Sequence, residues 1–192
     1  MRTPRTKLLG AVSVTRRNSD GSWHGDTMDG AAFVKGSKTP ALTLKERERF
    51  WWARARRAAR LLWRCSSQEF GNSSSTTPVP GASINQLIEI VSKIARGRVV
   101  SGPPDPTGCD MVSNATPMGM SPDDPLPVAA HLLNSSMFVG DVVAGHGTTP
   151  LLKAAKAAGC RTADGAQMVE AVQEMMLDFL LFSDANPSLF GL

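Results

Sequence analysis

The residues of this chain that could do chemistry lie in three short stretches. Asp29 stands in "GDTMDGAAFV", Asn114 and Thr116 stand in "VSNATPMGM", and Gly165 stands in "TADGAQM". A carboxylate can exchange a proton with a substrate, but an aspartate at the start of a helix is also a common N-cap. An asparagine that follows a strand is likewise common in turns. Each stretch alone is therefore weak evidence for a functional site.

The cysteines and histidines form no metal-binding pattern. They are scattered along the chain, without a Cys-x-x-Cys motif, at Cys65, Cys109, Cys160, His24, His131 and His146. We therefore expect neither a metal site nor a disulfide framework, and we expect a reducing, cytoplasmic location.

A hairpin and a helix are predicted to position Asp29. Between Leu8 and Gly36, an apolar run leads into an Asn-Ser-Asp-Gly turn and a second short strand around Ser22 to His24. This pattern is typical of a β-hairpin, and a helix is expected to begin at Asp29.

Strands and helices are predicted to alternate in the second half of the chain. The stretch "INQLIEIVSKIA" has a helical period, and the stretches "TPLLKAAKAAGC" and "GAQMVEAVQEMMLDFLLF" predict two further helices. Strands are expected at Arg98 to Val100, Asp110 to Asn114 and Met137 to Val143. The alternation indicates an α/β fold with a parallel sheet.

The middle of the chain follows neither pattern. Seven arginines and one glutamate lie between Arg47 and Arg64, in a chain of net charge +4, and the polar stretch "SSQEFGNSSSTTPVPG" follows. One interpretation is a basic helix whose arginines and tryptophans bind nucleic acid or an anionic membrane surface, although no nucleic-acid-binding motif supports it. The polar stretch is typical of a linker or a disordered segment. No apolar run approaches the roughly 18 residues of a membrane span.

Three stretches taken together resemble the shikimate/quinate dehydrogenase family, in that family's order. They are "GAVSV" with "GDTMDGAAFV", then "VSNATPMGM", then "TPLLKAAKAAGCRTADG". The resemblance implies an NAD(P)-dependent oxidoreductase that transfers hydride to or from a ring alcohol or ketone such as 3-dehydroshikimate. It also implies the remnant of a Rossmann-like NAD(P)-binding domain with a parallel sheet, in which the central βαβ unit is disrupted.

The resemblance assigns roles to individual residues. Asp29 would be the acidic catalytic partner that holds and orients the substrate hydroxyl and the lysine that moves the proton. Ser13 occupies the place of a substrate-binding asparagine, and Gln173 lies one position after Val172, where the family has a substrate-binding glutamine. The residues that would contact NADP or NAD are Asn114, Thr116, Met118, Gly119 and Gly165.

The resemblance also divides the chain into three parts. Residues 1–38 would end a substrate-binding domain and begin a linking helix, residues 39–81 would be irregular or disordered, and residues 82–192 would complete the NAD(P)-binding domain. The expected partner is a small molecule of the shikimate/quinate class, without a membrane or nucleic acid. The family's catalytic lysine lies before the stretch that matches Leu8, and the glycine-rich turn is missing, so we expect an inactive protein.

The arginine-rich segment has a second interpretation, as a frame-shifted translation of a βαβ unit. If the last base of each codon is read with the first two of the next, Phe50–Trp51 gives Leu, Trp51–Trp52 gives Val and Trp52–Ala53 gives Gly, without any choice of codon. Degenerate bases then permit a Gly-x-Gly-x-x-Gly turn and an apolar helix. Two compensating indels around residues 39–80 would explain the segment.

Overall fold

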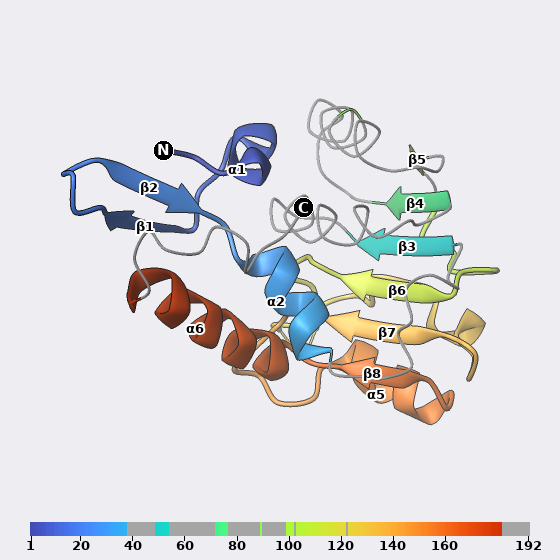
Figure 1. The fold of residues 1–192 in the computed structure, drawn as a ribbon. Helices are drawn as coiled ribbons and strands as arrows, with labels where there is room; N and C mark the ends of the chain where they lie inside the picture. The colour runs from blue at the N-terminus through green and yellow to red at the C-terminus, as the bar shows by residue number, and fades with distance from the viewer. Residues whose placement is uncertain are drawn as a thin grey trace.

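The computed structural model describes residues 1–37, 49–53, 72–76, 89, 99–101, 103–121 and 123–181. These residues form a six-stranded sheet with helices on both faces, and a two-stranded hairpin beside it (Figure 1). The α/β fold class predicted from the sequence is confirmed.

The hairpin consists of β1 (Val14–Arg17) and β2 (Trp23–Asp26), which pair in antiparallel fashion. The backbone N–H of Asn18 donates to Ser22 O at 2.8 Å. Gly21 adopts a φ of 81°, which an L side chain rarely allows. The predicted Asn-Ser-Asp-Gly turn is therefore confirmed.

Two helices flank the hairpin. Helix α1 (Pro4–Leu9) begins after Thr3, whose hydroxyl accepts from the Thr6 N–H, and the sequence analysis did not foresee this helix. Helix α2 (Asp29–Gly36) begins at Asp29, as predicted.

The sheet is entirely parallel, with the strand order β5-β4-β3-β6-β7-β8. The chain enters at the central strand, proceeds outward to one edge, and returns to the other side of the first strand. In such doubly wound sheets, ligands bind at the carboxyl ends of the two strands where the order reverses, here β3 and β6. The strands are β3 (Arg49–Ala53), β4 (Asn72–Thr76), β5 (Val99–Ser101), β6 (Met111–Asn114), β7 (Phe138–Asp141) and β8 (Arg161–Ala163).

Helices cover the two faces of the sheet differently. Helix α6 (Gly165–Leu181) packs with α2 on one face, while α5 (Pro150–Ala157) covers the other face beside the short 3-10 helix η2 (Ala130–Leu132) (Figure 1). Because successive strand residues point to opposite faces, β6 and β7 contribute to two cores. Met111 and Phe138 are buried with α2 and α6, whereas Val112 and Val139 are buried with α5.

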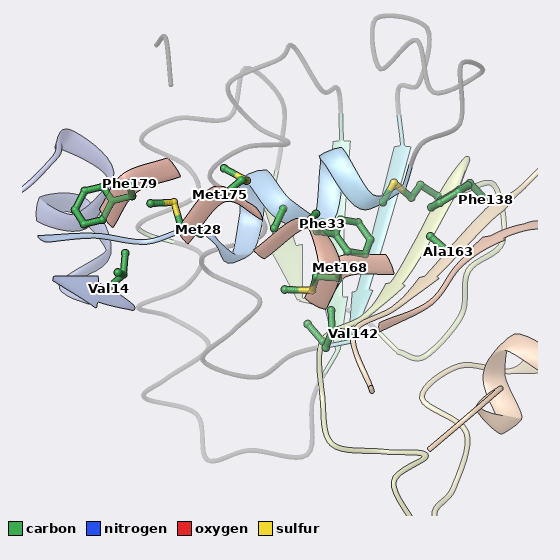
Figure 2. Close-up of a cluster of buried hydrophobic side chains, with 13 residues drawn as sticks. Val14, Met28, Phe33, Phe138, Val142, Ala163, Met168, Met175 and Phe179 are labelled. Atoms are coloured by element: carbon green, nitrogen blue, oxygen red, sulfur yellow. The ribbon is translucent and has the colours of Figure 1, made fainter. Parts of the chain in front are cut away.

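The core beneath α2 and α6 extends from the sheet to the hairpin (Figure 2). Its centre is the ring of Phe33, which lies so close to Gly140 of β7 that a Cβ there would come within 2.5 Å of the Phe33 Cζ atom. Its far end is formed by Val14, Met28 and Phe179. The hairpin and the sheet therefore share one hydrophobic core.

Arg16 also attaches the hairpin to α6. Its guanidinium lies 5.0 Å from the ring centroid of Phe179, and its Nη1 donates to the Phe179 carbonyl at 2.9 Å. A positive charge at the carboxyl end of a helix interacts favourably with the helix dipole, and a cation over an aromatic ring adds to this attraction.

The segment predicted to be irregular, residues 39–81, requires a correction at two places. It contains β3 and β4, and β3 lies at the start of the stretch that the alternative interpretation made a basic helix. Aromatic residues favour strands, and β3 gains backbone pairing with β4 and β6 on both edges. The rest of this segment lies outside the described residues, as does the helix predicted around residues 84–95, apart from the helical Glu89.

The other strands and helices predicted after residue 97 are confirmed within a few residues, and β8 was missed. Across the described residues, no helix combines the length and apolar character that a membrane span requires.

The closest approach between α2 and α6 generates a prediction about Gly36. A Cβ at Gly36 would lie 2.5 Å from the carbonyl oxygen of Gln167, a backbone atom that cannot rotate away. The substitution Gly36→Ala would normally favour a helix, but here we expect it to lower the free energy of unfolding by about 1–3 kcal/mol through overpacking. Urea denaturation would measure the change.

The matched control is the neighbouring residue Lys35, which forms an exposed ion pair with Glu174 at 2.7 Å. Lys35→Ala should change the free energy of unfolding by less than about 1 kcal/mol. Equal stability of Gly36→Ala and the unsubstituted protein would show that the two helices can separate without cost.

Candidate functional site

The candidate site lies where the carboxyl ends of β3, β6 and β7 meet. Ala53, Asn114 and Asp141 are paired in register across these three strands, so they form a row at one edge of the sheet. The stretch from Asn114 to Gly119 begins at the last residue of β6, and we call it the β6 loop. This is the region in which doubly wound sheets bind ligands.

The side chain of Asn114 is fully buried and organises the β6 loop from within. Its Nδ2 donates to the Met118 carbonyl at 2.9 Å, and its Oδ1 accepts from the Thr116 N–H at 3.0 Å and the Thr116 hydroxyl at 2.6 Å. The Met118 N–H in turn donates to Thr116 Oγ1 at 3.1 Å. The structure therefore brings together three of the predicted cofactor residues, but Asn114 and Thr116 use their polar atoms to shape the loop.

Gly119 fixes the far end of the β6 loop against α5. It has a φ of 95°, and its N–H donates to the carboxylate of Asp124 at 2.9 Å. An added Cβ would lie 3.7 Å from both Thr149 and Pro150, at the start of α5. The loop therefore rests on the first turn of this helix.

Asp141 is the residue of this site that the sequence analysis missed. Its carboxylate is completely buried, and it accepts from Asn114 Nδ2 at 3.0 Å, the Val143 N–H at 3.1 Å and Thr149 Oγ1 at 2.7 Å. Burial raises the pKa of Asp141, and the hydrogen bonds from Thr149, Val143 and Asn114 oppose this increase. An aspartate at the end of a buried strand was the only signal in the sequence.

Gly165, which was predicted to contact the cofactor, lies where two segments of the protein's own backbone approach closely. A Cβ at this position would lie 2.3 Å from the Val143 carbonyl oxygen and 2.8 Å from the Ala144 nitrogen. Helix α6 therefore begins directly against the turn that follows β7, and its start is capped by Asp164, whose carboxylate accepts from the Gln167 N–H at 3.0 Å.

Ser13 and Asp29 lie close to the same turn, at the start of α2. The N–H of Met28 donates to Ser13 Oγ at 3.2 Å, which places Ser13 beside the residue that precedes Asp29. Asp29 itself is partly buried at the first position of the helix. Thr27, in the same turn, is 3% exposed, and its hydroxyl has no hydrogen-bond partner in the described structure. The turn therefore offers a carboxylate and hydroxyl groups together.

Gln173 does not face the core on helix α6. The core-facing side of α6 carries Met168, Ala171 and Met175, and the partly buried Val172 packs against the same core. Gln173 is exposed, because it follows Ala171 by about 200° around the helix. The one-position offset noted in the sequence thus places the glutamine on the outer face of α6.

The described part of the chain contains no cluster of His, Cys, Asp and Glu that could hold a metal ion. Cys109 and Cys160 are free thiols. Cys160 is buried, its Sγ donates to the Asn134 carbonyl at 3.1 Å, and burial raises the pKa of its thiol. A raised pKa disfavours the reactive thiolate.

Comparisons with solved structures identify the fold. No family model matches the chain. The solved structures that resemble it include a shikimate 5-dehydrogenase from Listeria monocytogenes in complex with shikimate and NAD (TM-score 0.82, 20% identity, 92% of this chain and 65% of that one). They also include 5-ketofructose reductase of a Gluconobacter strain (TM-score 0.82, 22% identity, 94% and 66%). The chain therefore shares the Rossmann-like α/β fold of these two enzymes.

The sequence comparisons are more specific. Over 96 residues the chain is 36% identical to the shikimate dehydrogenase (NADP⁺) of Streptomyces avermitilis, and this alignment covers 47% of this chain and 32% of that enzyme. Over 78 residues it is 42% identical to the quinate/shikimate dehydrogenase (NAD⁺) of Corynebacterium glutamicum, which covers 41% and 27%. The predicted resemblance to the shikimate/quinate dehydrogenases is therefore confirmed. The aligned part spans about a third of the length of these relatives.

The raised pKa of Asp141 predicts a pH dependence of stability. Because the pKa lies above its ordinary value of 3.8, the folded protein binds this proton more tightly than the unfolded chain. The stabilising contribution of Asp141 is thus fully present below pH 3.8 and is lost as the pH rises through the raised pKa. Relative to Asp141→Asn, which cannot titrate, the unsubstituted protein should lose stability over that range in a series of urea titrations.

Asp105 provides a control of opposite sign. It is exposed, and its hydrogen bond with Thr107 lowers its pKa. Relative to Asp105→Asn, the unsubstituted protein should lose stability as the pH falls through the lowered pKa of Asp105. The assignment is contradicted if the difference in free energy of unfolding between the unsubstituted protein and Asp141→Asn stays constant with pH. It is also contradicted if that difference changes with pH in the same direction as the difference for Asp105→Asn.

Proposed function

We propose that this chain carries the nicotinamide side of a shikimate/quinate dehydrogenase-like oxidoreductase, which uses NADP or NAD and acts on a ring alcohol or ketone such as 3-dehydroshikimate. The observation that carries this proposal is the position of the β6 loop. This loop, which carries the resemblance in sequence, emerges at the reversal point of a doubly wound sheet, where dinucleotides bind in this fold.

The residues at the nicotinamide end fit such a cofactor. The β6 loop is held rigidly by its internal hydrogen bonds, and Gly119 presents no side chain. When bound, the nicotinamide would accept or donate the hydride. The turn at the start of α2 would bind the other reactant, since the Asp29 carboxylate can orient a substrate hydroxyl, and the Ser13 and Thr27 hydroxyls can contact neighbouring polar groups of a hydroxylated ring.

The residues that follow β3 fit the pyrophosphate of such a cofactor less well. Dinucleotide-binding folds place glycines directly after the first strand, because the backbone must approach the pyrophosphate closely. In this chain, Arg54 follows β3, and no glycine occurs between Arg54 and Arg64. In the overlapping reading frame, the codons of Trp52 and Ala53 give glycine, and these two residues end β3. This coincidence supports the frame-shift interpretation.

The missing glycine-rich turn predicts that the protein as it stands lacks turnover. Without close contacts to the pyrophosphate, we expect no reduction of NAD⁺ or NADP⁺ with shikimate or quinate above background, measured by absorbance at increasing substrate concentrations. A saturable rate that Asp29→Ala abolishes, and that the exposed control Asp105→Ala leaves intact, would overturn this expectation.

Correction of the reading frame predicts a gain of binding. If both indels are reversed, the segment after β3 should encode a glycine turn and a helix, whose N-terminal amides and dipole favour an anion. Titration calorimetry should then detect binding of NADP⁺ or NAD⁺ by the corrected protein and none by the present one. Equal behaviour of the two proteins would mean that the arginine-rich segment is a genuine element, and binding by neither would contradict the proposed function.

A further inference from the structure

The carboxylate of Asp141 contacts both structures that border the candidate site. Through Oδ1 it accepts from Asn114, which shapes the β6 loop, and through Oδ2 it accepts from Thr149, which caps α5. We propose that Asp141 is the positioning residue of this site, which fixes the Asn114 amide and thereby the β6 loop relative to α5. This inference rests on the proposed function, because the contact between the loop and a nicotinamide is proposed there.

Asp141 determines the orientation of the Asn114 side-chain amide. The side chain of Asn114 has a donor end and an acceptor end of nearly the same shape, so packing alone does not distinguish them. An ionised carboxylate only accepts hydrogen bonds, and it therefore requires the Nδ2 end of Asn114 to face Asp141. The Oδ1 end is then left for the N–H and hydroxyl of Thr116, the two contacts that bend the loop.

Asp141 also contacts the start of α5, the other border of the site. Thr149 Oγ1 donates to Asp141 and also accepts from the Leu152 N–H at 3.4 Å, as the N-cap of α5. Gly119, at the end of the loop, lies against Thr149 and Pro150. A single carboxylate therefore sets the positions of the loop and of the helix turn on which the loop rests.

Burial of the Asp141 carboxylate has an energetic cost. A buried carboxylate is costly unless its hydrogen bonds are satisfied, and none of the described residues forms an ion pair with Asp141, so it relies on three hydrogen-bond donors. Replacing a buried charged group with a packed apolar one is often neutral or stabilising. Stability alone therefore does not explain an aspartate at this position, whereas control of the loop does.

Hydrogen exchange of the full chain can test this role without any ligand. The probes are the amides of Thr116 and Met118, which are hydrogen-bonded only if the loop keeps its shape. Asp141→Ala should accelerate their exchange by about tenfold or more, because Asn114 loses an acceptor. Asp141→Asn should stay near the unsubstituted protein, because the Val143 N–H requires an acceptor at the place of Oδ1, and the amide oxygen held there can still accept from Asn114.

Two further variants separate positioning from general destabilisation. Val128→Ala, in the core around α5, is the control for lost stability and should leave the ratio of these two amides to other core amides unchanged. Asn114→Ala should accelerate the two amides as Asp141→Ala does, and the double variant should add nothing further, since both act through one contact.

The proposal is overturned if Asp141→Ala leaves the two amides protected, or if its effect adds fully to that of Asn114→Ala. If Asp141→Ala does not fold, the comparison of Asp141→Asn with Asn114→Ala decides: rapid exchange in both overturns the proposal, and rapid exchange in Asn114→Ala alone supports it. Because no ligand is involved, failure here counts against the positioning role alone. Failure of the calorimetric titrations counts against the proposed function alone.

Discussion

The pairing of β6 with β3 on one edge and β7 on the other is the constraint on which the rest of this structure depends. All four residues of β6 are buried, so its side chains must supply two cores at once. Met111 joins the core beneath α2 and α6, and Val112 joins the core beneath α5. The same pairing determines where the chain leaves the sheet, and therefore where Asn114 and the β6 loop lie.

Local patterns were sufficient where an element is specified by its own residues. The turn between Asn18 and Ser22 has the residues that its geometry requires, and the Thr149–Pro150 pair marks the start of α5 as a cap followed by proline. Elements that depend on distant partners were not predictable in this way. Strand β8 has only three residues and is a strand because it pairs with β7. Helix α1 is short, and its capping Thr3 is held by the Asp26 carboxylate at 2.8 Å.

In the candidate site too, residues in one local stretch were predictable, and contacts between distant residues were not. The motif order identified the residues of the β6 loop, because they are contiguous in sequence. Asp141 was not identifiable, because its contact with Asn114 joins residues 27 positions apart. No local pattern predicts that the Ser113 hydroxyl is buried in β6 without a hydrogen-bond partner in the described structure. Such a hydroxyl costs stability, and an apolar residue would suit this doubly buried strand better.

Strand β3 carries the strongest conflict between local sequence and position. A central parallel strand is covered on both faces and usually consists of aliphatic residues of moderate size, whereas β3 contains Phe50, Trp51 and Trp52 in succession. It is followed by arginines, where the fold requires glycines. The proposed shift of reading frame would account for both departures with one cause, because the same codons would then give Leu-Val-Gly, two aliphatic residues and a glycine at the strand end. Under this proposal the departures belong to one segment of coding sequence, and the elements on either side keep the pattern of the fold because their reading frame is unchanged.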